Sequence, residues 1–177
     1  MSTSELYEIL TEIGLNDVLV LPEDGLCNLP TPLEGGVVLN YESSHESGSH
    51  WYSLYIRGEQ AYVFDSLGAP PDDSVIDWAN RNNITLITST AKAQSNSSSL
   101  CGLWAIWFLS MIRTHSYSEI TRLIERQHTF EEKTERILLP LFESKWLMEY
   151  ENREVVLCQP QSFSLLPLEE RKSLPRN

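Results

Sequence analysis

The feature that most constrains the fold of this 177-residue chain is an apolar run that directly follows a Ser-rich polar loop. The run extends from Leu100 to Ile112 and is interrupted only by Gly102 and Ser110. It is shorter than the roughly 18 apolar residues of a membrane span, and its composition is typical of a helix buried on all sides. We therefore expect one globular domain built around residues 100–112, with no membrane as a partner.

The rest of the chain alternates between strand-like and helix-like segments. Short apolar segments separated by turn residues predict an antiparallel meander, and apolar residues at helical spacing predict helices. The expected strands are residues 36–41, 51–57, 61–65 and 84–89, and the expected helices are residues 4–13, 72–81, 100–112, 118–126 and 130–150, the last divided by Pro140. These segments predict an α+β fold, with a central, mostly antiparallel sheet of about four or five strands packed by helices.

The domain organisation is expected to be simple. Residues 1–150 form a single domain, and residues 151–177 form a C-terminal tail that docks on it, regulates access to it or merely trails. Within the tail, residues 155–157 are typical of a short edge strand. The prolines and glycines of residues 15–35 indicate an irregular surface segment.

Cys101 lies where the polar loop meets the apolar run. A thiol in the first turn of a helix lies near the positive end of the helix dipole, which favours the nucleophilic thiolate. A buried structural cysteine is the common alternative. Gly102, which allows close approach of a substrate, and the hydroxyls of Ser97–Ser99, expected to cap the helix, favour the reactive role. Cys27 and Cys158 lack such a setting, and we expect them to be structural.

His50 and Asp65 are the candidate base and the residue that orients it. If the chain turns at Gly58, the strand that starts beside His50 pairs with the strand that ends at Asp65, and the two side chains lie at the same sheet edge. His45 is the rival base, and a turn-initiating role is the alternative for Asp65.

Gln94, seven residues before Cys101, is the candidate donor to an oxyanion. The alternative for Gln94 is an ordinary polar loop residue. Together with His50, Asp65 and Cys101 it supplies the four groups that a cysteine protease needs.

The order of these residues resembles that of the adenovirus maturation protease (adenain) family and the wider group of ubiquitin-like-protein proteases. The segments that carry the resemblance are His50-Trp51, Val63–Gly68 and Gln94 through Leu103. The resemblance implies a papain-like site in permuted order, with His50 as base, Asp65 as orienter, Gln94 as oxyanion donor and Cys101 as nucleophile at the start of a buried helix. It also implies that Trp51 packs beside the histidine and, with Gly102, contacts the substrate.

Charge and composition limit the partners. The net charge is −12, with 13 Lys plus Arg against 25 Asp plus Glu, which argues against nucleic acid as the main partner. No His/Cys cluster has the spacing of metal ligands, and we expect no cofactor. The acidic, polar N-terminal segment is unlike a signal peptide, so we expect an intracellular protein that is not secreted. We expect it to be monomeric.

These observations predict a cysteine endopeptidase that cleaves capsid or other virion precursor proteins during particle maturation. The resemblance favours a member encoded by a virophage, a polinton-like element or another small DNA virus, active in the infected host cell and packaged in the virion. One alternative is a deubiquitinase- or deSUMOylase-like protease of ubiquitin-like modifiers. A second is a non-catalytic virion protein that retains the fold.

Overall fold

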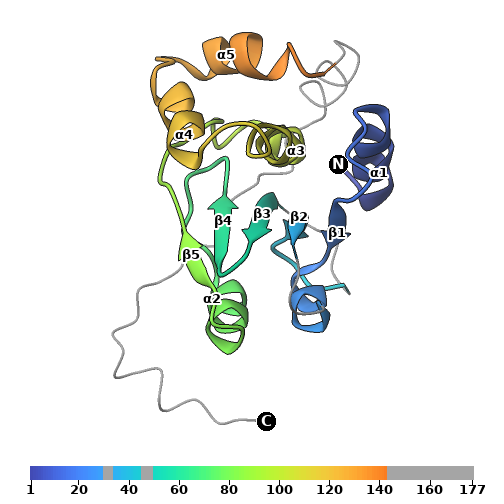
Figure 1. Ribbon diagram of the computed structural model, residues 1–177. Coiled ribbons are helices and arrows are strands. Elements are labelled where there is room, and N and C mark those ends of the chain that lie inside the picture. The colour runs from blue at the N-terminus through green and yellow to red at the C-terminus, as the bar shows by residue number, and fades with distance from the viewer. Residues whose placement is uncertain (30–33, 45–49, 143–177) are drawn as a thin grey trace.

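A five-stranded sheet forms the middle of the molecule in the computed structural model, which describes residues 1–29, 34–44 and 50–142 (Figure 1). The strands lie in sequence order across the sheet. They are β1 (Leu19–Leu21), β2 (Gly35–Asn40), β3 (Trp51–Arg57), β4 (Gln60–Phe64) and β5 (Thr85–Ile87).

The three central strands form the expected antiparallel meander. β3 pairs with β2 on one side and with β4 on the other, both antiparallel. The connection between β3 and β4 is the two residues Gly58 and Glu59, and Gly58 adopts a φ of 58°, which glycine tolerates without strain. This short turn fixes the register of the hairpin and therefore fixes which residues meet at its open end.

The two edges of the sheet differ from the expectation. β1 runs parallel to β2, and β5 runs parallel to β4, so the sheet is mixed. The sequence prediction missed β1, which lies in the segment expected to be irregular, although its central residue Val20 is buried. The pairing of β1 depends on β2, which is distant in the sequence, and three residues carry little periodicity of their own.

Helices cover both faces of the sheet. They are α1 (Thr3–Glu12), η1 (Glu23–Asn28), α2 (Asp73–Arg81), α3 (Cys101–Met111), α4 (Tyr117–Glu125), α5 (Phe130–Lys133) and the single π-helical turn η2 (Thr134–Leu138). One apolar cluster joins α1, α3 and α4 to one face, and another joins α2 and η1 to the opposite face. Figure 1 shows α2 on the side of the sheet away from α3.

The buried helix expected from the apolar run is α3. Every residue from Cys101 to Leu109 is buried, which explains why the run has no polar face. The expected serine cap is wrong. The residue preceding the helix is Leu100, no side chain caps it, and the Ser98 hydroxyl instead accepts from the Leu100 amide at 3.3 Å.

The other helices follow local signals. α1 and α4 begin with capping boxes, Ser2 with Glu5 and Ser116 with Glu119, and Asp72 caps α2. On α2 the buried residues are Val75, Trp78 and Ala79, whereas Ile76 is 38% exposed.

Several predictions fall outside the described residues. They concern His45, Cys158, the edge strand at 155–157, the tail 151–177 and the end of the helix expected to reach residue 150. Of that helix the structure describes α5 and η2, which end before Pro140. Among the described residues no helix is long and apolar enough to cross a membrane.

Candidate active site

Cys101 is the first residue of α3 and is 4% exposed. It belongs to the same apolar cluster as Trp51, the residue next to the candidate base. The helix therefore presents its N-terminal end, where the dipole is positive, at the sulfur atom. This is the setting that the sequence predicted for the nucleophile.

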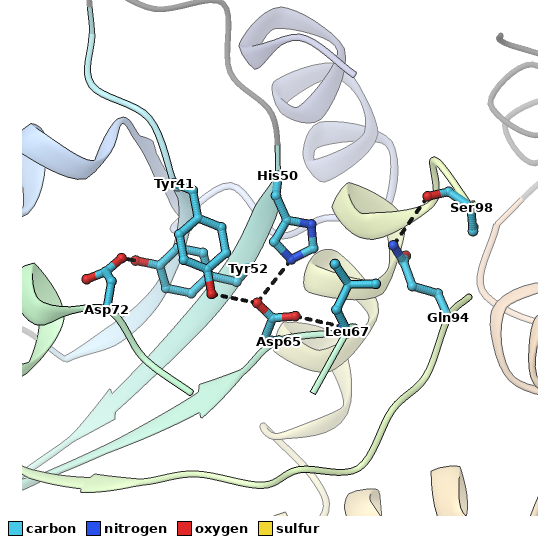
Figure 2. Close-up of polar contacts among 8 residues, drawn as sticks. All are labelled: Tyr41, His50, Tyr52, Asp65, Leu67, Asp72, Gln94 and Ser98. Atoms are coloured by element: carbon cyan, nitrogen blue, oxygen red, sulfur yellow. Dashed lines mark hydrogen bonds and ion pairs between the residues drawn. The ribbon is translucent and has the colours of Figure 1, made fainter. Parts of the chain in front are cut away.

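His50 and Asp65 lie at the open end of the β3–β4 hairpin. His50 directly precedes β3, and Asp65 directly follows β4. The two residues are 5% and 3% exposed, and His50 Nε2 lies 3.0 Å from Asp65 Oδ2 (Figure 2). The register of the hairpin thus brings together two residues that the sequence placed at one sheet edge.

Asp65 is held by several donors at once. Its Oδ1 accepts from the Leu67 amide at 2.7 Å, and its Oδ2 accepts from the Tyr41 hydroxyl at 2.9 Å. Its backbone carbonyl accepts from the Gly68 amide at 3.0 Å. Asp65 therefore also has the turn-initiating role given as its alternative, since the same carboxylate organises the turn after β4 and contacts the histidine.

These contacts assign the proton on the neutral histidine ring. Oδ2 of Asp65 is an acceptor, so Nε2 of His50 is the donor in this hydrogen bond. In the neutral ring the other nitrogen, Nδ1, then carries the lone pair. Nδ1 is buried. It is the nitrogen of His50 that can take up a proton during a reaction.

Gln94 is 2% exposed and is tied to the turn that follows Asp65. The amides of Ala93 and Gln94 both donate to the carbonyl of Ser66, at 2.8 and 3.1 Å. The Gln94 side chain donates one Nε2 hydrogen to the carbonyl of Ser98 at 3.4 Å (Figure 2). A primary amide has two such hydrogens, so the second remains available for another acceptor.

The loop that carries Gln94 also borders a small pocket of about 150 Å³. Gln94 and Leu100 line it, together with Phe130, Glu131 and Thr134. The pocket therefore connects the Ser-rich loop before Cys101 with α5 and η2. It offers a small, partly polar space beside the candidate oxyanion donor.

Met1 contacts both residues that were expected to contact a substrate. Trp51 is 8% exposed, and its Nε1 donates to the Met1 carbonyl at 2.9 Å. A Cβ on Gly102 would meet the sulfur of Met1 and would lie 3.1 Å from a methyl group of Leu6. The close approach at Gly102 therefore exists, and in this structure α1 and the residues before it fill that space. Substrate contact by Trp51 and Gly102 stays a prediction.

Sequence reasoning missed Tyr41. Its ring stacks on the His50 ring, with 5.2 Å between centroids and 20° between planes, and its hydroxyl reaches Asp65. Burial, and next the charge of Asp65, raise the pKa of Tyr41 well above its usual value, so the phenol stays protonated and acts as a donor. The signal that could have found Tyr41 is its place at the end of the strand expected over residues 36–41, which comes before the candidate histidine.

Among the described residues no group of His, Cys, Asp or Glu is arranged to hold a metal ion. The remaining cysteine there, Cys27, is exposed, and its thiol donates to the Asp24 carbonyl at 2.9 Å. A cysteine at the start of a helix and a buried histidine held by an aspartate are the kinds of group that nucleophilic chemistry on a carbonyl group uses.

No protein-family model matches this sequence, and no curated protein matches it either. Its fold is similar to that of the ASFV pS273R protease, known from a crystal structure of the selenomethionine protein. The TM-score is 0.52 at 17% sequence identity, and the match covers 78% of this chain and 67% of that one. The likeness confirms the predicted fold class: an α+β domain with a mixed five-stranded sheet packed by helices, shared with a protease.

Proposed function

We propose that this chain is a cysteine endopeptidase with Cys101 as nucleophile and His50 as general base. The observation that carries the proposal is the buried contact of 3.0 Å between His50 and Asp65, two residues that flank different strands. A buried, oriented imidazole is what a thiol nucleophile requires of its base. The start of α3 at Cys101 supports the assignment of the nucleophile.

In the proposed reaction the Cys101 thiol gives its proton to Nδ1 of His50, and its sulfur bonds to the carbonyl carbon of the peptide. His50 returns the proton to the leaving amine as the C–N bond breaks, which leaves an acyl thioester on Cys101. Water, deprotonated by the same nitrogen, then attacks the thioester and releases the acid product and the thiol. Asp65 keeps Nε2 protonated throughout and stabilises the imidazolium.

The oxyanion formed in each half of the reaction needs donors fixed in advance. We assign the second Nε2 hydrogen of Gln94 and the backbone N–H of Cys101 to this role. The contact of Gln94 with Ser98 supports this assignment because it limits rotation of the amide. The bonds of Ala93 and Gln94 to Ser66 support it further, since they link the donor loop to the turn that holds Asp65.

For the substrate we propose virion precursor proteins, with cleavage in the infected cell and in the assembling particle. The motif order of the sequence and the likeness in fold to the ASFV pS273R protease support this choice. The net charge of −12 makes a protein a more suitable partner than a nucleic acid.

The test of the reaction is covalent labelling with a thiol-reactive peptide probe, followed by peptide mapping. We expect the wild-type protein to be labelled at Cys101, and Cys101→Ala to remain folded and unlabelled. Cys27→Ala is the matched control and keeps the labelling, because Cys27 is exposed and lies outside the site. A wild-type protein that is not labelled at Cys101 would contradict the proposed function.

The test of the substrate class compares co-expressed virion precursors with a panel of ubiquitin-like-modifier conjugates, with mass spectrometry of the products. We expect internal cleavage of the precursors. Release of modifiers alone would identify the chain as a protease of ubiquitin-like modifiers instead.

A further inference from the structure

Tyr41 contacts both members of the His50–Asp65 pair, and the reaction above gives it no part. It directly follows β2, and its amide donates to the His50 carbonyl at 3.1 Å. This bond extends the pairing of β2 with β3 by one residue beyond Asn40 and Trp51. Tyr41 is therefore the cross-strand neighbour of His50, with its backbone position fixed by the sheet.

The side chain of Tyr41 contacts both residues of the pair. Its ring lies nearly parallel to the His50 ring, with centroids 5.2 Å apart. Its hydroxyl donates to Asp65 Oδ2 at 2.9 Å, and the same oxygen accepts from His50 Nε2 at 3.0 Å (Figure 2). The two donors flank different strands and share one carboxylate oxygen as their acceptor.

These contacts restrict two separate motions. The Leu67 amide holds Oδ1 of Asp65, and the phenol of Tyr41 holds Oδ2, the oxygen that contacts the imidazole, independently of that ring. The stacked tyrosine ring also limits rotation of the imidazole about its Cβ–Cγ bond. The distance from Nδ1 to a reacting sulfur depends on both motions, and small errors in such a distance cost rate steeply.

We propose that Tyr41 is a positioning residue, which holds Asp65 and through it His50 in the orientation required for proton transfer. This inference rests on the proposed function, because it assigns Tyr41 a part in the same reaction. Because burial raises the pKa of Tyr41, its half-buried phenol keeps its proton at neutral pH and remains a donor.

The chain contains a matched control for this role. Tyr52 packs on Tyr41, with ring centroids 4.7 Å apart, and its hydroxyl donates to Asp72 Oδ2 at 2.9 Å. Asp72 caps α2 by accepting from the Val75 amide at 2.8 Å. Tyr52→Phe therefore removes the same kind of bond, in the same part of the sheet, from an aspartate without a histidine partner.

The experiment measures kcat and KM of the full chain with a fluorogenic peptide that ends in Gly-Gly. We expect Tyr41→Phe, which keeps the ring, to lower kcat about tenfold with KM changed less than about twofold, the loss typical of one bond to a charged group. Tyr52→Phe is expected to keep both constants within about twofold of wild type, and the melting temperature controls for lost stability. A kcat of Tyr41→Phe equal to that of wild type, or an equal loss in both variants, would overturn the proposal.

Two further readouts separate positioning from ordinary packing. In an Asp65→Ala background, Tyr41→Phe should cause no additional loss of kcat, because Tyr41 acts through Asp65. In the unliganded protein, the proton NMR signal of His50 Nε2–H should be present in wild type and in Tyr52→Phe, and broadened by exchange with water in Tyr41→Phe. Additive losses of kcat, or an unchanged signal in Tyr41→Phe, would contradict the proposal.

The outcomes also distinguish this inference from the proposed function. If wild type cleaves the peptide and Tyr41→Phe matches it, only the role of Tyr41 is wrong. If wild type neither cleaves the peptide nor is labelled at Cys101, the proposed function is wrong, and the positioning role fails with it.

Discussion

Two buried aspartates, Asp65 and Asp72, have similar surroundings, and of the two Asp65 contacts a histidine. Each accepts a hydrogen bond of 2.9 Å from a tyrosine, Asp65 from Tyr41 and Asp72 from Tyr52, and the two tyrosine rings pack on each other. Each also organises the backbone that follows it. A buried carboxylate with a phenol donor is therefore not in itself the mark of an active site.

The remaining donors separate the two aspartates. Asp72 accepts from the Val75 amide at 2.8 Å and the Ser74 hydroxyl at 2.7 Å, groups that keep their protons at any physiological pH. Asp65 accepts from His50, whose ring has a second nitrogen that can take up a proton. In the proposed reaction the two aspartates therefore differ in one respect: the imidazole that donates to Asp65 changes its number of protons, and the donors of Asp72 do not.

Removing the imidazole of His50 is the change with the largest expected effect on this comparison. We expect His50→Ala to lower kcat about 10³–10⁴-fold, since both the base and the acid of the reaction are lost. The measurement is steady-state cleavage of the Gly-Gly peptide by protein with an unchanged circular dichroism spectrum. His115→Ala is the control, because His115 is exposed, and it should retain full activity. If His50→Ala were active, Asp65 would be a purely structural residue like Asp72.

The next prediction concerns Gln94, which is linked through the carbonyl of Ser66 to the turn after Asp65. We expect Gln94→Ala to lower kcat about 10²–10³-fold, the loss typical of one oxyanion donor, with a smaller change in KM.

Gln94→Glu serves as the matched variant, because it keeps the shape of the side chain and removes both amide hydrogens. It should lose at least as much rate as Gln94→Ala. Full activity in Gln94→Glu would show that the amide does not act as a donor.

The sequence was sufficient for the contact between His50 and Asp65 because that contact depends on local rules. A two-residue turn at Gly58 and Glu59 leaves little choice of register, and a strand start and a strand end then meet. The strongly periodic helices and the apolar run of α3 were predictable for the same reason.

The sequence was insufficient where distant segments decide the structure. β1 forms because β2 offers it an edge, and the serines before Cys101 do not cap α3 although their composition suggests it. The contact of Tyr41 with Asp65 required the pairing of β2 with β3 across the loop that joins them. The contact of Met1 with Trp51 depends on how α1 packs, which no local pattern reveals.

The smallest effects are expected when each aspartate is replaced by alanine, which compares the two residues directly. We expect Asp65→Ala to lower kcat about 10²-fold, less than the loss of the base itself, because it removes the orientation and charge support of His50 and leaves the imidazole in place. We expect Asp72→Ala to keep kcat within about twofold and to lower the free energy of unfolding by about 1–2 kcal/mol, because it removes the cap of α2 and a partner of Tyr52. Denaturant unfolding and cleavage rates per folded molecule, measured on both variants, check the two expectations together. Equal losses of kcat in the two variants would mean that the network as a whole, and not the histidine at one end of it, governs the reaction.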